Sequence, residues 1–301
     1  MIQEKPDRQT YRNDLETELE AHFKIINACS VETEDKERVL LAAKPESRYP
    51  YFYPRDVACA SELLARLSTS EYAFADDAYK LLTSVAKFVL KAIRNDGYIG
   101  QRYALSGEEK SIYKQEDNNA HGMIILSHFL LTAKQRREEV QDIADYLFAI
   151  NSAALYAIKN YYHPEINLFH STTSIHESAI EEGFSCWTNF AYLKAFFLVS
   201  KVNRELDEPD IIPDKLLLFE AAFKHNLFGI MVSNNRFLRR IDQKGNYDFK
   251  PDFTLLSPFY FGFGEETKDY LDNSVDFLER QLWDPELGMI QRYLPFSGDK
   301  E

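Results

Sequence analysis

The sequence contains little cysteine and comparatively little positive charge. Its three cysteines, Cys29, Cys59 and Cys186, lie far apart in the 301 residues. This spacing predicts neither a disulfide framework nor a clustered zinc site, so we expect each to be a small, buried apolar residue. The 48 acidic residues outnumber the 35 basic ones, and the net charge of -13 argues against nucleic acid and anionic membranes as partners.

Long apolar runs and several common motifs are also missing. No stretch of about 18 apolar residues predicts a membrane helix, and the polar start does not resemble a secretory signal, so we expect a cytoplasmic protein. The sequence has no Gly-rich phosphate loop, nucleophile elbow or HExxH motif. After these exclusions, the remaining possibility is chemistry by Asp and Glu side chains on a neutral ligand, and we expect no metal or cofactor. Glycosidic bond cleavage by two carboxyl groups is its commonest form.

Apolar residues recur at helical spacing along most of the chain. The hydrophobic content of 45% is sufficient for a large core, and we expect residues 1–301 to form one domain. Residues 37–43 favour a short strand. Gly245 and Asn246 are typical of a hairpin turn between residues 237–241 and 247–249. The predicted helices span about residues 12–27, 55–67, 72–94, 119–134, 138–158, 183–202, 213–226 and 267–282.

Short and long connections alternate between these helices. Short links force antiparallel hairpins, so every long loop lies at one end of the assembly. Such long loops are uncommon in a compact domain unless they form a site, and these are rich in aromatic and charged residues. Two loop segments also resemble each other, because residues 101–108 read QRYALSGE and residues 291–299 read QRYLPFSGD. We therefore predict an all-α toroid of helical hairpins with its function at the long-loop end.

Two loop motifs contain candidate ligand-binding residues. Residues 49–56 read YPYFYPRD, in which Arg55 offers donors, Asp56 offers acceptors and the aromatic faces suit a sugar ring. The Arg–Asp pair would equally cap a helix. Residues 113–122 read YKQEDNNAHG, whose carboxylate and amide side chains are good N-caps, although Asp117 would equally suit a polyhydroxylated ligand. His121 has no sequence neighbours suited to a metal site or a general base, so we interpret it as structural.

Carboxylates crowd into a third motif, which begins at Ser174 and reads SIHESAIEEGFSCWTN. Glu181 and Glu182 are explained by the first turn of the following helix, where acidic side chains meet the positive end of the helix macrodipole. Glu177 lies further back in the loop and has no such explanation. The motif therefore allows either a helix start or a functional cluster.

Taken together, these motifs resemble the glucoamylase family, glycoside hydrolase family 15. The resemblance rests on YFYPRD before a helix, QED at the start of a later one, the Glu-rich turn before an aromatic Thr–Asn helix, and a closing Arg–Tyr. It implies an (α/α)6 barrel of helical hairpins. It also implies inverting hydrolysis of α-glucosidic bonds from non-reducing ends, with an α-glucan or oligosaccharide as substrate.

The resemblance also assigns roles to individual residues. The family's general acid aligns with position 179, which is alanine here, so the acid is sought among Glu177, Glu181 and Glu182. We favour Glu177, because a loop carboxyl group near apolar residues can be desolvated and stay protonated. The resemblance assigns substrate binding to Tyr49, Tyr53, Arg55, Asp56 and Arg292. We add Asp117 and Trp187 as further candidates for substrate binding.

The resemblance is incomplete at the C-terminal end. The family's general base lies well downstream of the Arg–Tyr motif, and no residue of this sequence matches it. The predicted helices are also fewer than six hairpins require. We therefore expect a fragment of a longer product or a truncated form with an open barrel, whose exposed apolar faces would favour self-association. Two alternatives stay open: a non-catalytic carbohydrate-binding or regulatory domain, and sugar epimerisation, which would require histidines facing the pocket.

Overall fold

The computed structural model describes residues 8–33, 37–173, 175, 180–206 and 214–293. Within these ranges it contains nine α-helices, of which eight correspond to predicted helices. The ninth, α8, is a short helix in a segment predicted to be a loop. None of the described helices is long and apolar enough to cross a membrane. The helices are α1 (Arg8–Ala28), α2 (Pro54–Ser68), α3 (Ala75–Ala92), α4 (Asn118–Arg136), α5 (Ile143–Asn160), α6 (Cys186–Leu206), α7 (Asp214–Ile230), α8 (Ser257–Tyr260) and α9 (Lys268–Leu282), with a 3₁₀ helix, η1, at Phe253–Leu256.

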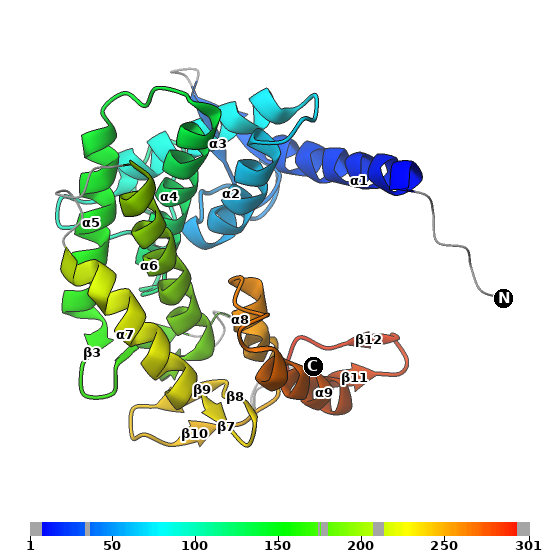
Figure 1. Cartoon of the computed structure of the whole chain (residues 1–301), viewed down its shortest axis with the longest axis vertical. Helices are drawn as coiled ribbons and strands as arrows, with labels where there is room; N and C mark the ends of the chain where they lie inside the picture. The colour runs from blue at the N-terminus through cyan, green and yellow to red at the C-terminus, as the bar shows by residue number, and fades with distance from the viewer. Residues whose placement is uncertain (1–7, 34–36, 174, 176–179, 207–213, 294–301) are drawn as a thin grey trace.

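The helices follow one another around an arc, from α1 through α4 to α7 and on to α9 (Figure 1). Helix α4 packs against α2, α3, α5 and α6. It is buried on all sides from Asn118 to Ala133, whereas α2 and α3 each bury one face. A helix that is buried all round belongs to the interior of a large fold. Helices α2, α4 and α6 therefore form the inner row, and α3, α5 and α7 pair with them on the outside.

Short strands occupy the long loops that precede the inner helices. The main sheet has the order β10-β9-β6-β5 and joins the loop before α6 to the loop after α7. All described strand pairs are antiparallel. The strands are β1 (Ser30–Glu32), β2 (Arg38–Leu40), β3 (Tyr162–His163), β4 (Leu168–Phe169), β5 (Ser171–Thr173), β6 (Ile180–Ser185), β7 (Val232–Ser233), β8 (Arg236–Phe237), β9 (Arg240–Asp242), β10 (Tyr247–Asp248), β11 (Trp283–Asp284) and β12 (Met289–Ile290).

The long loops contact one another, as the alternation of loop lengths predicted. The loop before α2 pairs with the loop before α4 through Phe52 and Tyr103. The loop before α4 bonds to the next long loop, because the backbone N–H of Thr172 donates to Glu116 over 3.0 Å. That third loop pairs with the fourth through β6 and β9. The N-termini of the inner helices therefore lie at one end of the fold, together with the long loops.

The repeated Gln-Arg-Tyr sequence occupies similar places in the structure. Tyr103 forms an antiparallel bridge with Phe52, just before α2, and Tyr293 forms one with Asp252, just before η1 and α8. In each case a loop that leaves one helix pairs with the segment that enters the helix before it in the chain. The sequence echo therefore reflects equivalent loop positions in the row of hairpins, as predicted.

One local prediction at the site was wrong. Glu181 and Glu182 are not in the first turn of a helix, because residues 180–185 form strand β6 and α6 begins only at Cys186. The Ser185 hydroxyl accepts a hydrogen bond from the backbone N–H of Thr188 over 3.1 Å, which is an N-cap contact. Gly183 has a φ of +148°, and a Cβ there would lie 2.4 Å from the carbonyl oxygen of Ile241. Residues 180–185 therefore pair closely with β9, and the helix begins later than predicted.

The cysteines also differ from the expectation that all three are buried. Cys186 is buried and Cys29 is half-buried, but Cys59 is exposed. Cys59 lies on the side of α2 that borders a cavity rather than the hydrophobic core. This cavity is described with the candidate site.

Candidate active site at the long-loop end

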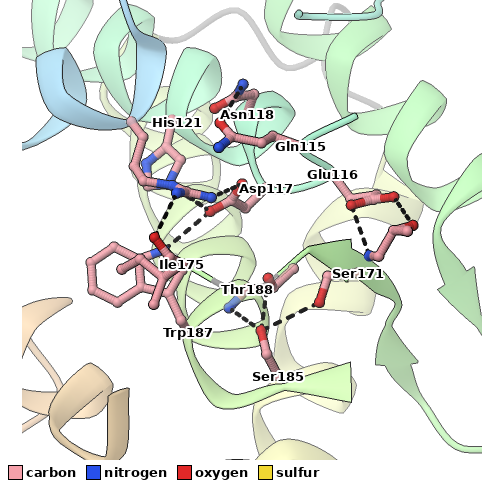
Figure 2. Close-up of polar contacts among 12 residues, drawn as sticks. Gln115, Glu116, Asp117, Asn118, His121, Ser171, Ile175, Ser185, Trp187 and Thr188 are labelled. Carbon is pink, nitrogen blue, oxygen red and sulfur yellow. Dashed lines mark hydrogen bonds and ion pairs between the residues drawn. The ribbon is translucent and has the colours of Figure 1, made fainter. Parts of the chain in front are cut away.

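Asp117 connects the first turns of the three inner helices. The guanidinium of Arg55 on α2 donates to both of its carboxylate oxygens, over 3.0 and 3.1 Å. The indole N–H of Trp187 on α6 donates to it over 3.1 Å, and Nε2 of His121 on α4 lies 3.3 Å away. Figure 2 shows Asp117 between His121 and Trp187. The predicted site residues Arg55, Asp117 and Trp187 are therefore in direct contact.

The charge of Asp117 is fixed by these contacts. Burial by itself would raise the pKa of this carboxyl group, but the charge of Arg55 and the hydrogen bonds from His121 and Arg55 hold the pKa well below its ordinary value. Asp117 is 2% exposed, and both of its oxygens already accept hydrogen bonds. It is therefore suited to orienting Arg55 and Trp187, and not to donating a proton.

Arg55 also reaches the Glu-rich segment. Its Nη1 atom donates to the backbone carbonyl of Ile175 over 3.4 Å. Ile175 lies two positions before Glu177 in the sequence. Glu177, the favoured acid, is outside the described residues, as are its immediate neighbours. The contact nevertheless places Ile175 at the end of the fold that carries Asp117.

The residues around Asp117 join loops and do not cap α4 as expected. Asp117 occupies the N-cap position, but its side chain makes no capping hydrogen bond, so that expectation was wrong. The buried carboxylate of Glu116 accepts from the hydroxyl of Thr172 over 2.6 Å. Its backbone carbonyl accepts from the hydroxyl of Tyr192 on α6 over 2.5 Å. Glu116 and Asp117 therefore link the start of α4 to the loop before α6 and to α6 itself (Figure 2).

The two glutamates of β6 have different surroundings. Glu181 bonds to the guanidinium of Arg239 over 2.5 Å, and the same guanidinium also binds Asp248 and Asp252, each over 2.8 Å. Burial opposes the charged form of Arg239, but these carboxylates raise its pKa above the ordinary value. Glu182 is exposed and accepts from the Gln243 amide over 2.6 Å. Neighbouring residues of a strand face opposite ways, which separates these two carboxylates.

Aromatic rings connect Trp187 to the predicted arginine near the C-terminal end. The ring of Trp187 lies 4.8 Å from those of Tyr260 and Phe261 and 6.1 Å from that of Phe253, measured between centroids. The guanidinium of Arg292 lies over the ring of Phe253, 5.0 Å from its centroid. Arg292 is therefore linked to Trp187, and so to the Asp117 cluster, through the ring of Phe253.

The remaining predicted residues lie at two other places. The rings of Tyr49 and Tyr53 are 6.3 Å apart in an edge contact, and the hydroxyl of Tyr53 accepts from Arg102 over 3.2 Å. Asp56 is exposed in the first turn of α2. Burial, Cys59 and the charge of Asp56 raise the pKa of Tyr260, which places Asp56 near the aromatic wall.

A cavity of about 320 Å³ lies between α2, α4, α6 and α8, and His121 is one of its lining residues. Its wall includes the rings of Tyr260 and Phe261 and the charged residues Glu62 and Lys194. Tyr260 belongs to none of the sequence motifs, and the motif that contains His121 indicated only a structural role. No local pattern could have found either residue, because the contacts that bring them to the site come from separate helices. Among the described residues, no group of three or more His, Cys, Asp or Glu side chains could hold a metal ion.

His128 is a second buried histidine of α4, next to the charged end of this cavity. Burial lowers its pKa to about 4. Positive charges on α2 and α6 add to this effect, and the negative charge of Glu62 opposes it. The positive charges belong to Lys194, Arg66 and Lys201.

We expect His128 to make the fold less stable in acid. An unfolded histidine titrates near about pH 6.5, so between that pH and about 4 the unfolded chain binds a proton that the folded chain excludes. The free energy of unfolding should therefore fall by about 3 kcal/mol as the pH falls through this window. Urea unfolding of the wild type and His128→Leu between pH 7 and pH 4 measures the contribution. Identical pH dependence in both proteins would contradict the expectation.

Comparison with known proteins identifies the fold. No family model matches the chain, and no curated protein matches it. A glucoamylase from Saccharomycopsis fibuligera matches with a TM-score of 0.69 and 15% identity, over 94% of this chain and 68% of that one. A wild-type glycosidase matches with a TM-score of 0.63 and 14% identity, over 96% and 75%. A sugar epimerase from a ruminal bacterium matches with a TM-score of 0.59 and 12% identity, over 93% and 72%.

These similarities define the class of fold. The chain is mostly helical and has the helical-toroid fold of these solved structures, as the hairpin pattern predicted. The presence of a sugar epimerase among the neighbours shows that the fold also hosts other chemistry. The reaction must therefore be inferred from the site.

Proposed function

We propose that the protein is a glycoside hydrolase that releases sugar from the non-reducing ends of α-glucosides. The observation that carries the proposal is the Arg55–Asp117–Trp187 cluster at the inner-helix N-termini, bonded through Arg55 to the loop before Glu177. A guanidinium with a fixed orientation beside aromatic rings suits the hydroxyls and the ring of a neutral sugar. In this proposal Arg55 and Asp56 bind the terminal sugar, with Tyr49 and Tyr53 at the same loop end.

The proposed general acid is Glu177. Glu181 is committed to the buried guanidinium of Arg239 and would have to leave it to reach a substrate. Glu182 is exposed and bonded to Gln243, on the opposite side of β6 from Glu181. Glu177 would protonate the glycosidic oxygen while a second carboxylate, which no residue of this sequence matches, activates a water molecule on the opposite face of the sugar. In inverting enzymes these two groups are separated by roughly 6.5–9.5 Å.

The proposal is tested by the configuration of the first product. Purified protein is incubated with maltose and maltotriose, and the anomers of released glucose are followed by proton NMR before mutarotation. We expect the β anomer to form first, because direct attack by water inverts the α bond. Initial α-glucose would contradict inversion. Binding of maltotriose without hydrolysis would favour the alternative, a non-catalytic carbohydrate-binding domain, and absence of both would overturn both functions.

A further inference from the structure

His121 lines the cavity and carries a buried ring nitrogen without a hydrogen-bond partner in the part of the chain that the structure describes. His121 is 1% exposed, and its Nε2 atom lies 3.3 Å from the ionised carboxylate of Asp117. This contact assigns the ring proton to Nε2, so Nδ1 is left as an acceptor. Among the described residues Nδ1 has no hydrogen-bond partner. A buried acceptor without a partner is costly, which indicates that a donor from a ligand completes the site.

Groups of both charges lie further along the same cavity. Glu62 and Lys194 line the cavity, and the buried His128 lies near both. Each of the three follows a residue of the Asp117 cluster by seven positions on its helix. Seven residues are two helical turns, or about 10 Å. The ammonium group of Lys194 lies 3.4 Å from the carboxylate of Glu62, which also accepts from Arg66 over 2.7 Å. The cavity therefore offers an acceptor at one end and a nearly balanced set of donors and acceptors at the other.

The composition of the wall selects the class of ligand. A simple anion would meet the carboxylate of Glu62 beside each available cation, and a simple cation would meet Lys194. A neutral molecule with several hydroxyl groups can donate to His121 and Glu62, accept from Lys194, and pack a ring against Tyr260. The volume of about 320 Å³ is at the small end of ligand pockets, which favours a single sugar ring.

We propose that this cavity binds a neutral polyhydroxylated molecule of monosaccharide size, with one hydroxyl group donating to Nδ1 of His121. The choice of a sugar as ligand rests on the proposed function, but none of the described residues of the loop before α6 lines this cavity. His121 would then have two roles, one for each ring nitrogen. Nε2 holds Asp117 in place, and Nδ1 contacts the ligand.

Two substitutions of His121 separate these roles. A glutamine amide reaches the position of Nε2, whereas an asparagine amide occupies that of Nδ1. We expect His121→Gln to weaken D-glucose binding about tenfold with a melting temperature near that of the wild type. We expect His121→Asn to keep the affinity within about threefold but to lower the melting temperature, because the contact with Asp117 is lost. Calorimetric titration with D-glucose and thermal unfolding measure the two effects.

The titrations also decide between ligands and between proposals. Equal glucose affinity of His121→Gln and the wild type would overturn the inference, as would absence of glucose binding to the wild type. Displacement of glucose by inorganic phosphate at equal concentration would overturn it in favour of an anion site. Glucose binding that depends on His121, in a protein that hydrolyses no maltooligosaccharide, would support this site and count against the proposed reaction only.

Discussion

Glu177→Gln is expected to reduce hydrolysis of maltotriose by at least about 100-fold, the usual contribution of a positioned general acid. Glutamine has nearly the same shape as glutamate but cannot give a proton to the leaving oxygen. Binding of maltotriose should therefore be retained, and the loss should lie in kcat. Initial-rate kinetics together with calorimetric titration of the inactive variant measure both quantities.

Two glutamine variants serve as comparisons for this experiment. Glu181→Gln is expected to lower the unfolding midpoint, because it removes the charge that faces Arg239, while the folded protein still hydrolyses substrate. Glu108→Gln changes an exposed carboxylate paired with Lys110 and should have no effect on either property. Full activity in Glu177→Gln together with its loss in Glu181→Gln would transfer the acid role to Glu181.

Arg239→Met is expected to destabilise the fold by about 3–5 kcal/mol, the usual effect of removing one partner from a buried ion pair. Arg239 is 4% exposed and is the shared partner of Glu181, Asp248 and Asp252. Methionine can fill much of the space but leaves these carboxylates facing one another without this counter-charge. Asp252 also caps η1, so the disturbance should extend to the segment before α8.

Urea unfolding at neutral pH measures this loss. Lys110→Met removes an exposed ion pair and is the matched control, with an expected change below about 0.5 kcal/mol. Combining Arg239→Met with Glu181→Gln should recover part of the loss, because one of the unpaired charges is then removed. Should Arg239→Met prove too unstable to purify, Arg239→Lys keeps the charge and allows the comparison. Equal stability of Arg239→Met and Lys110→Met would show that the cluster does not stabilise the fold.

Local patterns in the sequence were sufficient for the helices and for their arrangement in hairpins. Helical periodicity is a property of neighbouring residues, so α2, α3, α4 and α9 were found close to their observed bounds. Alternating loop lengths placed the long loops at one end, because a short connection leaves a helix pair no other geometry. Arg55, Asp117 and Trp187 were selected from three separate motifs, and the structure brings them into contact.

Tertiary structure alone decided what the charged groups of these motifs do. Residues 180–185 form a strand because β9, which comes from a distant part of the chain, pairs with them. The residues next to Glu181 and Glu182 in the sequence give no indication of that partner. The role of Asp117 follows from donors on two other helices, which saturate its carboxylate and keep it ionised. Burial, pairing and an unpartnered ring nitrogen depend on what surrounds a residue in space. The sequence alone therefore determined the row of hairpins and the end of the fold at which the candidate site lies. Only the packing of the helices showed that Arg239, His121 and the cavity belong to that end.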